Sequence, residues 1–201
     1  MFFSLTDSSR QNNTHICPVE RAGGLDNRIR RWLQNPQKIL RPYITEGMTV
    51  LDVGCGPGFF SLDMAHMVGK SGRVIASDLQ EGMLQKVKEK IKGTVLEERI
   101  IVHRCEENNI GVSEPVDFVL LFYMVHEVPN QEDLLNEIRT ILKPHGQVLI
   151  VEPPFHVSKS AFEETMRKAG SAGFKIVERP KVLFSKAVIL KKGLSDTGKY
   201  G

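Results

Sequence analysis

The sequence predicts an α/β fold with a seven-stranded, mostly parallel sheet, helices on both faces and an antiparallel last strand. The first observation is that short apolar runs alternate with helical patterns from residue 49 to residue 152, which is typical of a parallel sheet with right-handed crossovers. The second is that only Arg179-Pro180-Lys181 separates the last two strand-like runs. So short a link cannot carry a parallel crossover, and these two strands are therefore expected to pair antiparallel.

Length and composition are typical of a single-domain soluble protein. The chain has 201 residues, of which 41% are hydrophobic and 25% charged, enough for one domain with a sizeable core. The formal net charge is only +3, and the basic cluster Arg28, Arg30 and Arg31 is more typical of a solvated helix face than of a nucleic-acid site. We therefore expect no nucleic-acid partner.

The cysteines and the apolar runs indicate a cellular compartment. Three cysteines stand far apart without a C-x-x-C motif, which favours a reducing cytosol over a disulfide framework, and we assign no metal ligands. No apolar run approaches the ~18 residues that span a bilayer. No signal-peptide core follows Met1, so we expect a cytoplasmic protein without a membrane span.

The first 45 residues are expected to form a helical extension ahead of the sheet. Asp26 stands where an N-cap belongs, and a second short helix is expected to start at Asn35-Pro36 and to end at Arg41-Pro42. One helical face of the first helix carries Leu25, Ile29, Trp32 and Leu33. We expect this extension to act as a lid over the ligand site, with Cys17 and Tyr43 on the substrate side, although a structural role for either residue stays open.

The domain proper is expected to span residues 46–192, followed by a flexible tail over 193–201. Strands are predicted near 49–54, 73–78, 99–104, 116–122 and 147–152, and the closing pair near 174–179 and 182–190. Helices are predicted near 58–68, 81–92, 130–142 and 158–169. Asn130 caps the third of these helices, and Lys143-Pro144-His145-Gly146 stops it.

The most informative stretch is Thr-Val-Leu-Asp-Val-Gly-Cys-Gly-Pro-Gly-Phe-Phe at 49–60. A strand, a glycine turn and a helix in this order let the backbone approach a ligand at the carboxyl end of the strand. A dinucleotide fingerprint that begins at Gly54 would need glycine where Phe59 stands. An acid inside the strand, Asp52, and a glycine at position 58 suggest instead a site for a ribose-linked amino acid. We therefore expect close helix packing at that glycine to matter less than room for the ligand.

The carboxyl ends of the other strands supply further candidates, because ligands of open parallel sheets bind there. Asp78 is placed to accept hydrogen bonds from ribose hydroxyls, and Leu79 beside it could pack on a purine. Glu106 could accept from an adenine amino group. Two candidates, His126 and Glu127, follow the fourth strand.

Each of these candidates has a structural alternative. Asp78 could instead cap the following helix. Glu106 is ambiguous with Glu107 and with plain solvation of the loop. Cys55 and Cys105 are more typical of small packing residues than of nucleophiles.

Several segments together resemble the class I S-adenosylmethionine-dependent methyltransferases, whose sheet is Rossmann-like. These segments are Leu51–Gly58, Val74–Leu79, Asp117–Val128 and Leu142–Glu152. The nearest resemblance is to the small-molecule branch that includes quinone-precursor and arsenite methyltransferases, although Phe59 and Phe60 replace smaller residues and the arsenite type's multiple cysteines are not evident.

The resemblance implies S-adenosylmethionine as cofactor and S-adenosylhomocysteine as product. It implies that Asp78 holds the ribose, that Leu79 and Glu106 flank the adenine, and that Phe122 lines the methionine side. The residues implied to border the methionine part, together with the rest of their loop, are Asp52, Gly54, Cys55, Gly56 and Gly58.

The expected reaction is transfer of a methyl group to a small-molecule acceptor by in-line displacement, which positioning and exclusion of water can promote. A base is needed only if the acceptor arrives protonated, and His126 and Glu127 are the best-placed candidates. Alternatives are a non-catalytic S-adenosylmethionine-binding or S-adenosylhomocysteine-binding protein and a protein methyltransferase. Phe59 and the closing hairpin disfavour a nicotinamide-dependent oxidoreductase, and the weak charge disfavours an RNA substrate. We expect a monomer or a homodimer.

Overall fold

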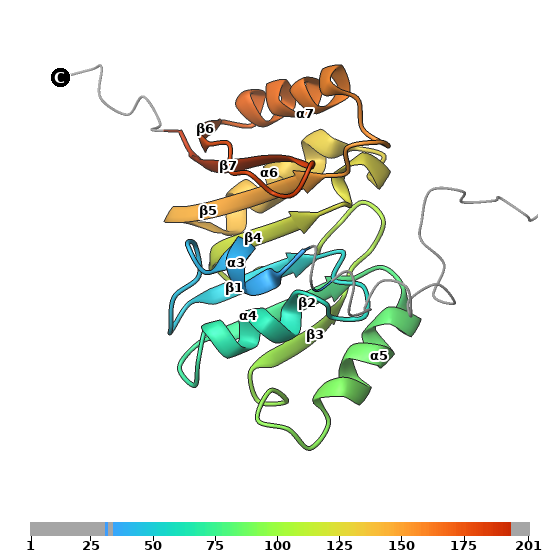
Figure 1. Cartoon of the computed structure of the whole chain (residues 1–201), viewed down its shortest axis with the longest axis vertical. Helices are drawn as coiled ribbons and strands as arrows, with labels where there is room; N and C mark the ends of the chain where they lie inside the picture. The colour runs from blue at the N-terminus through green and yellow to red at the C-terminus, as the bar shows by residue number, and fades with distance from the viewer. Residues whose placement is uncertain (1–30, 32–33, 194–201) are drawn as a thin grey trace, which may run out of the picture.

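The computed structural model describes residue 31 and residues 34–193, and Figure 1 shows their arrangement. A single sheet has the strand order β3-β2-β1-β4-β5-β7-β6. Its strands are β1 (Thr49–Val53), β2 (Arg73–Asp78), β3 (Ile100–Arg104), β4 (Val116–Phe122), β5 (Leu142–Glu152), β6 (Phe174–Glu178) and β7 (Lys186–Lys192). The described helices are α3 (Pro36–Leu40), α4 (Ser61–Met67), α5 (Glu81–Ile91), the 3₁₀ turn η2 (Val125–Glu127), α6 (Gln131–Ile141) and α7 (Lys159–Ser171).

The predicted fold class is confirmed. Strands β1 to β5 pair parallel, and β7 runs antiparallel to both β5 and β6. The strand order reverses at β1, which has β2 on one side and β4 on the other. In open parallel sheets, this switch point is where ligands bind.

Helices cover both faces of the sheet, as predicted. On one face, α3, α4 and α5 pack on side chains such as Phe118 and Leu120 of β4. On the other face, α6 and α7 pack on the alternate residues, such as Val119 and Leu121. Figure 1 shows α3 and α4 in front of the sheet and α6 behind β5. Since both faces are covered, β1 is buried along its whole length and β4 at every residue except Asp117.

The predicted starts of two helices are confirmed by their caps. The Asn35 side chain accepts a hydrogen bond from the Lys38 amide, and Pro36 occupies the first turn of α3. The Asn130 side chain accepts from the amides of Glu132 and Asp133 at the start of α6.

Three predicted element starts differ from the structure by more than one residue. The helix predicted from residue 58 begins at Ser61, because Gly58 has a left-handed φ of +83°. Strand β5 begins at Leu142 rather than 147, since Leu142 already pairs with Val116 in the sheet. Strand β7 begins at Lys186 rather than 182, because residues 179–185 form a loop.

Part of the predicted extension lies outside the described residues. This is the case for the first N-terminal helix apart from Arg31, for Cys17, and for the tail beyond residue 193. The role of residues 1–45 as a lid therefore stays a prediction.

Candidate active site

A cavity of about 970 Å³ opens at the carboxyl ends of the parallel strands, around the switch point. It brings together ten of the residues predicted for the site. They are Asp52, Gly54, Cys55, Gly56, Asp78, Leu79, Glu106, Phe122, His126 and Glu127. Gly58 and Tyr43 do not line it.

The glycine loop after β1 is held in conformations that favour glycine. The φ angles of Gly54, Gly56 and Gly58 are +69°, +55° and +83°. A Cβ atom added at Gly56 would meet nothing within 4 Å, so this part of the loop leaves open space. The Gly56 amide donates a 2.8 Å hydrogen bond to Asp78 Oδ2, which fixes the loop against the end of β2.

Gly58 has a packing role, and the expectation that packing matters less at this position is wrong. A Cβ atom there would lie 2.7 Å from Leu62 Cδ1 and 3.2 Å from Val87 Cγ2. Leu62 belongs to α4 and Val87 to α5. The missing side chain therefore lets both helices approach the loop, and the cavity lies on the other side.

The Asp78 carboxylate accepts hydrogen bonds both from the glycine loop and from the start of the following helix. Besides the Gly56 bond, its Oδ1 accepts a 2.9 Å hydrogen bond from the amide of Gln80, the residue that precedes α5. Burial raises the pKa of this carboxyl group, and the backbone hydrogen bonds oppose that shift. The Leu79 amide also bonds to this carboxylate. An ionised carboxylate has about four acceptor positions, so the three amides still leave capacity for a ligand hydroxyl.

Asp52 is the buried acid of the central strand. It is 2% exposed, and Ser61 Oγ donates a 2.5 Å hydrogen bond to its Oδ2. Ser61 is the first residue of α4, so this charge-assisted bond joins the start of the helix to β1. Sequence reasoning missed Ser61, because a serine nine residues away carries no signal of this contact.

The loop after β3 forms the next wall of the cavity. Glu106 and Asn109 exchange two backbone hydrogen bonds, which close a tight turn. Glu137 of α6, which was not predicted, accepts hydrogen bonds from the amides of Ile110 (2.9 Å) and Gly111 (2.8 Å) and so anchors the loop. Both Glu106 and Glu107 line the cavity, so the choice between them stays open.

An aromatic cluster lines the cavity beside the glycine loop. The Phe60 and Phe122 ring centroids lie 4.3 Å apart, and Phe122 lies 4.4 Å from Tyr123. Phe59 meets Phe60 edge to face at 5.0 Å. The two phenylalanines that depart from the family's smaller residues therefore extend the wall that contains Phe122.

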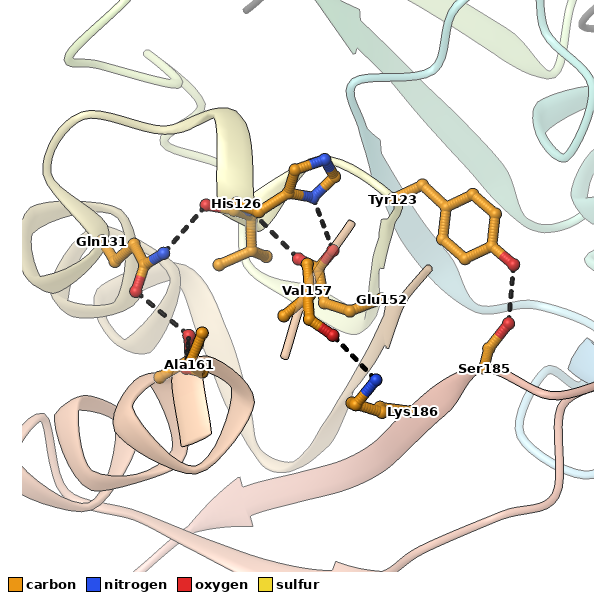
Figure 2. A network of polar contacts seen from close by, with 10 residues as sticks. Tyr123, His126, Gln131, Glu152, Val157, Ala161, Ser185 and Lys186 are labelled. Carbon is orange, nitrogen blue, oxygen red and sulfur yellow. Dashed lines mark hydrogen bonds and ion pairs between the residues drawn. The ribbon is translucent and has the colours of Figure 1, made fainter. Parts of the chain in front are cut away.

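Tyr123 joins three segments at the cavity and was not singled out from the sequence. Its hydroxyl lies 2.6 Å from Ser185 Oγ in the β6–β7 loop (Figure 2). The same hydroxyl accepts a 2.9 Å hydrogen bond from Gln34 Nε2. Its φ of +59° is rare for a residue with a side chain. The Tyr123 amide donates a 2.8 Å hydrogen bond to the Val151 carbonyl, which helps to hold this conformation.

The cysteines of the cavity remain thiols. Burial, followed by the charges of Asp52 and Asp78, raises the pKa of Cys55 well above its usual range. Burial also raises the pKa of Cys105. Because the thiolate is the nucleophile, these environments favour the interpretation of both as packing residues.

His126 is held by Glu152, an acid that the prediction did not include. The His126 amide donates to Glu152 Oε1 over 3.1 Å, and Nδ1 lies 2.6 Å from Oε2 (Figure 2). The Glu152 side chain is 2% exposed, whereas that of His126 is 26% exposed. The hydrogen bond to Glu152 raises the pKa of His126, and burial opposes the shift. Because an ionised carboxylate only accepts, Nδ1 carries a proton and Nε2 is the nitrogen that is left for another partner.

Glu152 carried a signal that could have been used. It is the last residue of β5, and the rule that assigned Asp78 at the end of β2 applies equally there.

Tyr43 lies away from the cavity, which corrects the expectation that it contacts substrate. Its ring stacks on Phe118 at 6.1 Å, and Phe118 lies near the start of β4 rather than at its carboxyl end. Burial and the nearby Glu178 raise the pKa of Tyr43 to about 12. The residue belongs to the core on that face of the sheet.

The sequence of residues 44–187 matches the family model described as "Methyltransferase domain". The chain belongs to the methyltransferase-domain family. The resemblance to class I S-adenosylmethionine-dependent methyltransferases is thereby confirmed, together with their fold.

Curated relatives are similar over part of their length. Demethylmenaquinone methyltransferase from Listeria welshimeri is 30% identical over 122 residues, which cover 61% of this chain and 51% of the relative. The enzyme of the same name from Lactococcus lactis is 32% identical over 58% of this chain and 48% of the relative. The chain thus spans about half the length of the curated relatives it matches.

Solved structures match over most of the chain. A SAM-dependent methyltransferase from Aquifex aeolicus has a TM-score of 0.75 and 28% identity, over 87% of this chain and 98% of that one. A putative S-adenosyl-L-methionine-dependent methyltransferase from Methanococcus maripaludis has a TM-score of 0.73 over 96% and 99%, and its 18% identity supports the fold alone.

The cavity fits the cofactor of this family, S-adenosylmethionine. The open space at Gly56 admits a ligand against the backbone, and Asp78 keeps acceptor capacity for a ligand hydroxyl. The apolar Leu79 and the acids Glu106 and Glu107 lie along the same cavity. These are the residue types that a ribose and an adenine need.

Within residue 31 and residues 34–193, none of the helices has both the length and the apolar character that crossing a membrane requires. The cytoplasmic location, the monomeric or dimeric state, and the absence of metal ligands and of a nucleic-acid partner stay predictions.

Proposed function

We propose that the chain transfers a methyl group from S-adenosylmethionine to a small-molecule acceptor by in-line displacement. The observation that carries this proposal is the composition of the one cavity at the switch point. One side of the cavity is built from the glycine loop and Asp78. The other side is built from the aromatic residues around Phe122 and from His126. The demethylmenaquinone methyltransferases among the relatives support a small acceptor.

On the cofactor side, Asp78 would hold the ribose hydroxyls, and Leu79 with Glu106 or Glu107 would flank the adenine. Asp52, Gly54, Cys55, Gly56 and Phe122 would border the methionine part, because all five line the cavity. When bound, S-adenosylmethionine supplies an electrophilic methyl group on its sulfonium.

On the acceptor side, His126 is proposed as the base for an acceptor that arrives protonated. Its Nε2 is the nitrogen that Glu152 does not engage, and the buried carboxylate stabilises the imidazolium that forms when Nε2 takes a proton. Phe60, Phe122 and Tyr123 exclude water from one wall of the cavity. Glu127 also lines the cavity and is the alternative base.

An acceptor screen tests the proposal. The protein is incubated with S-adenosylmethionine and a panel of thiols, phenols, amines and arsenite, and release of S-adenosylhomocysteine is measured. We expect turnover with one chemical class, and loss of that turnover in the Asp78→Ala variant. Tight S-adenosylmethionine binding without turnover on any small acceptor or peptide would favour the non-catalytic alternative, and turnover on peptides alone would favour a protein methyltransferase.

A further inference from the structure

The mouth of the cavity carries the two most exposed large apolar side chains of the described residues. Phe155 is 94% exposed and Phe184 is 86% exposed, and both line the cavity. Leu183, next to Phe184, is also exposed and lines the same mouth. Phe155 lies in the loop between β5 and α7, and Phe184 in the loop between β6 and β7.

Hydrogen bonds and buried valines hold these two loops in place, so the backbone of each loop fixes the outward position of its phenylalanine ring. Lys186, the first residue of β7, donates a 2.8 Å hydrogen bond from Nζ to the Val157 carbonyl (Figure 2) and a 3.3 Å one to the Pro154 carbonyl. These bonds tie the end of the β6–β7 loop to the β5–α7 loop. Val157 and Val182 are buried, one in each loop. Each loop therefore directs one valine inward and one phenylalanine outward.

The backbone at Phe184 supports the same conclusion. Its φ of +51° lies in the left-handed region, which is strained for a residue with a side chain. The Ser185 amide donates to the Val182 carbonyl over 2.7 Å, which closes the turn around Phe184. The loop thus keeps an exposed aromatic ring in a conformation with an energetic cost.

The two loops that carry the rings contain charges of one sign, whereas the acids Glu106, Glu107 and Glu127 line other parts of the cavity. Neither residues 153–159 nor residues 179–186 contain aspartate or glutamate. Lys159 and Lys181 are exposed and take part in none of the ion pairs found in the described part of the chain. Arg179 is paired with Glu163 of α7. Exposed aromatic rings flanked by unpaired lysines complement the anionic surface of a lipid bilayer.

We propose that Phe155 and Phe184 dock the mouth of the cavity on an anionic lipid surface. The rings insert at the level of the headgroups, while Lys159 and Lys181 face the lipid charges. Charge disfavours a second copy of the chain as the occupant, because two copies that met at these loops would bring exposed lysines together without acids in the same loops to pair them. This proposal concerns a surface and is independent of the acceptor.

Co-sedimentation of the full chain with phospholipid vesicles tests the proposal. Vesicles of phosphatidylcholine alone are compared with vesicles that also contain phosphatidylglycerol. We expect the chain to bind the anionic vesicles more tightly, and Phe155→Ser and Phe184→Ser each to lower the partition coefficient by about tenfold. Lys181→Gln is expected to lower it about fivefold, and on the anionic vesicles only.

Val95→Ser is the matched control, because Val95 is 65% exposed but precedes β3 and so lies at the opposite end of the sheet. It should leave vesicle binding unchanged, and thermal unfolding should show that all variants are folded. The proposal is overturned if the unaltered chain does not bind anionic vesicles, or if Val95→Ser weakens binding as much as Phe184→Ser. It is also overturned if the phenylalanine substitutions abolish self-association in sedimentation velocity without changing vesicle binding, which would assign the surface to a second copy.

Discussion

The two sides of the cavity are built in different ways. The cofactor side is built around a short segment, Asp52 to Gly58, which is fixed by the hydrogen bond from the Gly56 amide to Asp78 and by tight helix packing. The acceptor side consists of side chains from η2, the end of β5 and the β6–β7 loop, joined by contacts such as His126–Glu152 and Tyr123–Ser185. Backbone geometry thus defines the first side, and side-chain chemistry the second.

This difference indicates how each side should respond to substitution. On the cofactor side, changes at neighbouring positions are expected to separate into effects on folding and effects on binding. On the acceptor side, changes are expected to affect turnover and its pH dependence, because Tyr123, His126 and Ser185 are partly exposed and Glu152, although buried, contacts His126 directly.

The largest expected effect is on the acceptor side, with His126→Gln. If His126 removes a proton from the acceptor, kcat should fall by roughly 10²–10⁴-fold with little change in S-adenosylmethionine affinity. Steady-state kinetics and calorimetric titration measure the two quantities. Glu127→Gln is the matched control, and the assignment of the base is wrong if Glu127→Gln lowers kcat more than His126→Gln does.

The next effect distinguishes two glycines of one loop. Gly58→Ala should destabilise the fold by about 2 kcal/mol, because its φ is positive and its Cβ would lie 3.2 Å from the branched Val87 side chain, while the terminal methyl group of Leu62, at 2.7 Å, would have to turn aside. Gly56→Ala should cost only about 1 kcal/mol, because it carries the φ strain without a clash. Urea unfolding measures both. Equal losses at the two positions would contradict the packing role of Gly58.

Asp78→Ala should weaken S-adenosylmethionine binding by roughly 100-fold, through the loss of charge-assisted hydrogen bonds worth ~1.5–3 kcal/mol each. Because burial raises the pKa of Asp78, binding to the unaltered chain should weaken as the pH falls through that raised pKa, where protonation removes acceptor capacity. Calorimetric titration over a pH series measures this. An unchanged dissociation constant in Asp78→Ala argues against the ribose contact.

The smallest expected effect is that of Glu152→Gln, which tests Glu152 as a positioning residue. The Glu152 carboxylate raises the pKa of His126, so kcat of the unaltered chain should rise with pH through that raised pKa. In Glu152→Gln the rise should occur at lower pH, with a plateau about tenfold lower, because the imidazolium loses its partner. A merely structural role would lower kcat without moving the pH profile.

Stability should follow the same linkage. A histidine whose pKa is raised in the folded state contributes stability that is fully present below its unfolded pKa and is lost as the pH rises through the folded value. Glu152→Gln should therefore lower the free energy of unfolding more at acidic pH than at alkaline pH, as urea unfolding at two pH values can show.

Sequence reasoning predicted the cofactor side more completely than the acceptor side. Asp52, Gly56 and Asp78 were assigned from one segment and one strand end, and all three line the cavity. Glu152 was missed, and Tyr43 was placed on the substrate side although it stacks on Phe118. The loop that carries Phe184 and Ser185 was predicted as part of a strand over 182–190. The apolar residues Val182 and Leu183 fit a strand as well as they fit a loop with one buried side chain, so their pattern could not distinguish the two.

The sequence by itself determined the order of strands and helices, the glycine loop and its neighbouring acids, because these depend on local periodicity and on backbone conformations that one short segment encodes. Only the tertiary structure decided which distant side chains meet, such as Glu152 with His126 and Ser185 with Tyr123. It also decided that Gly58 serves helix packing, because the contacts of that glycine come from two helices whose approach no local pattern specifies.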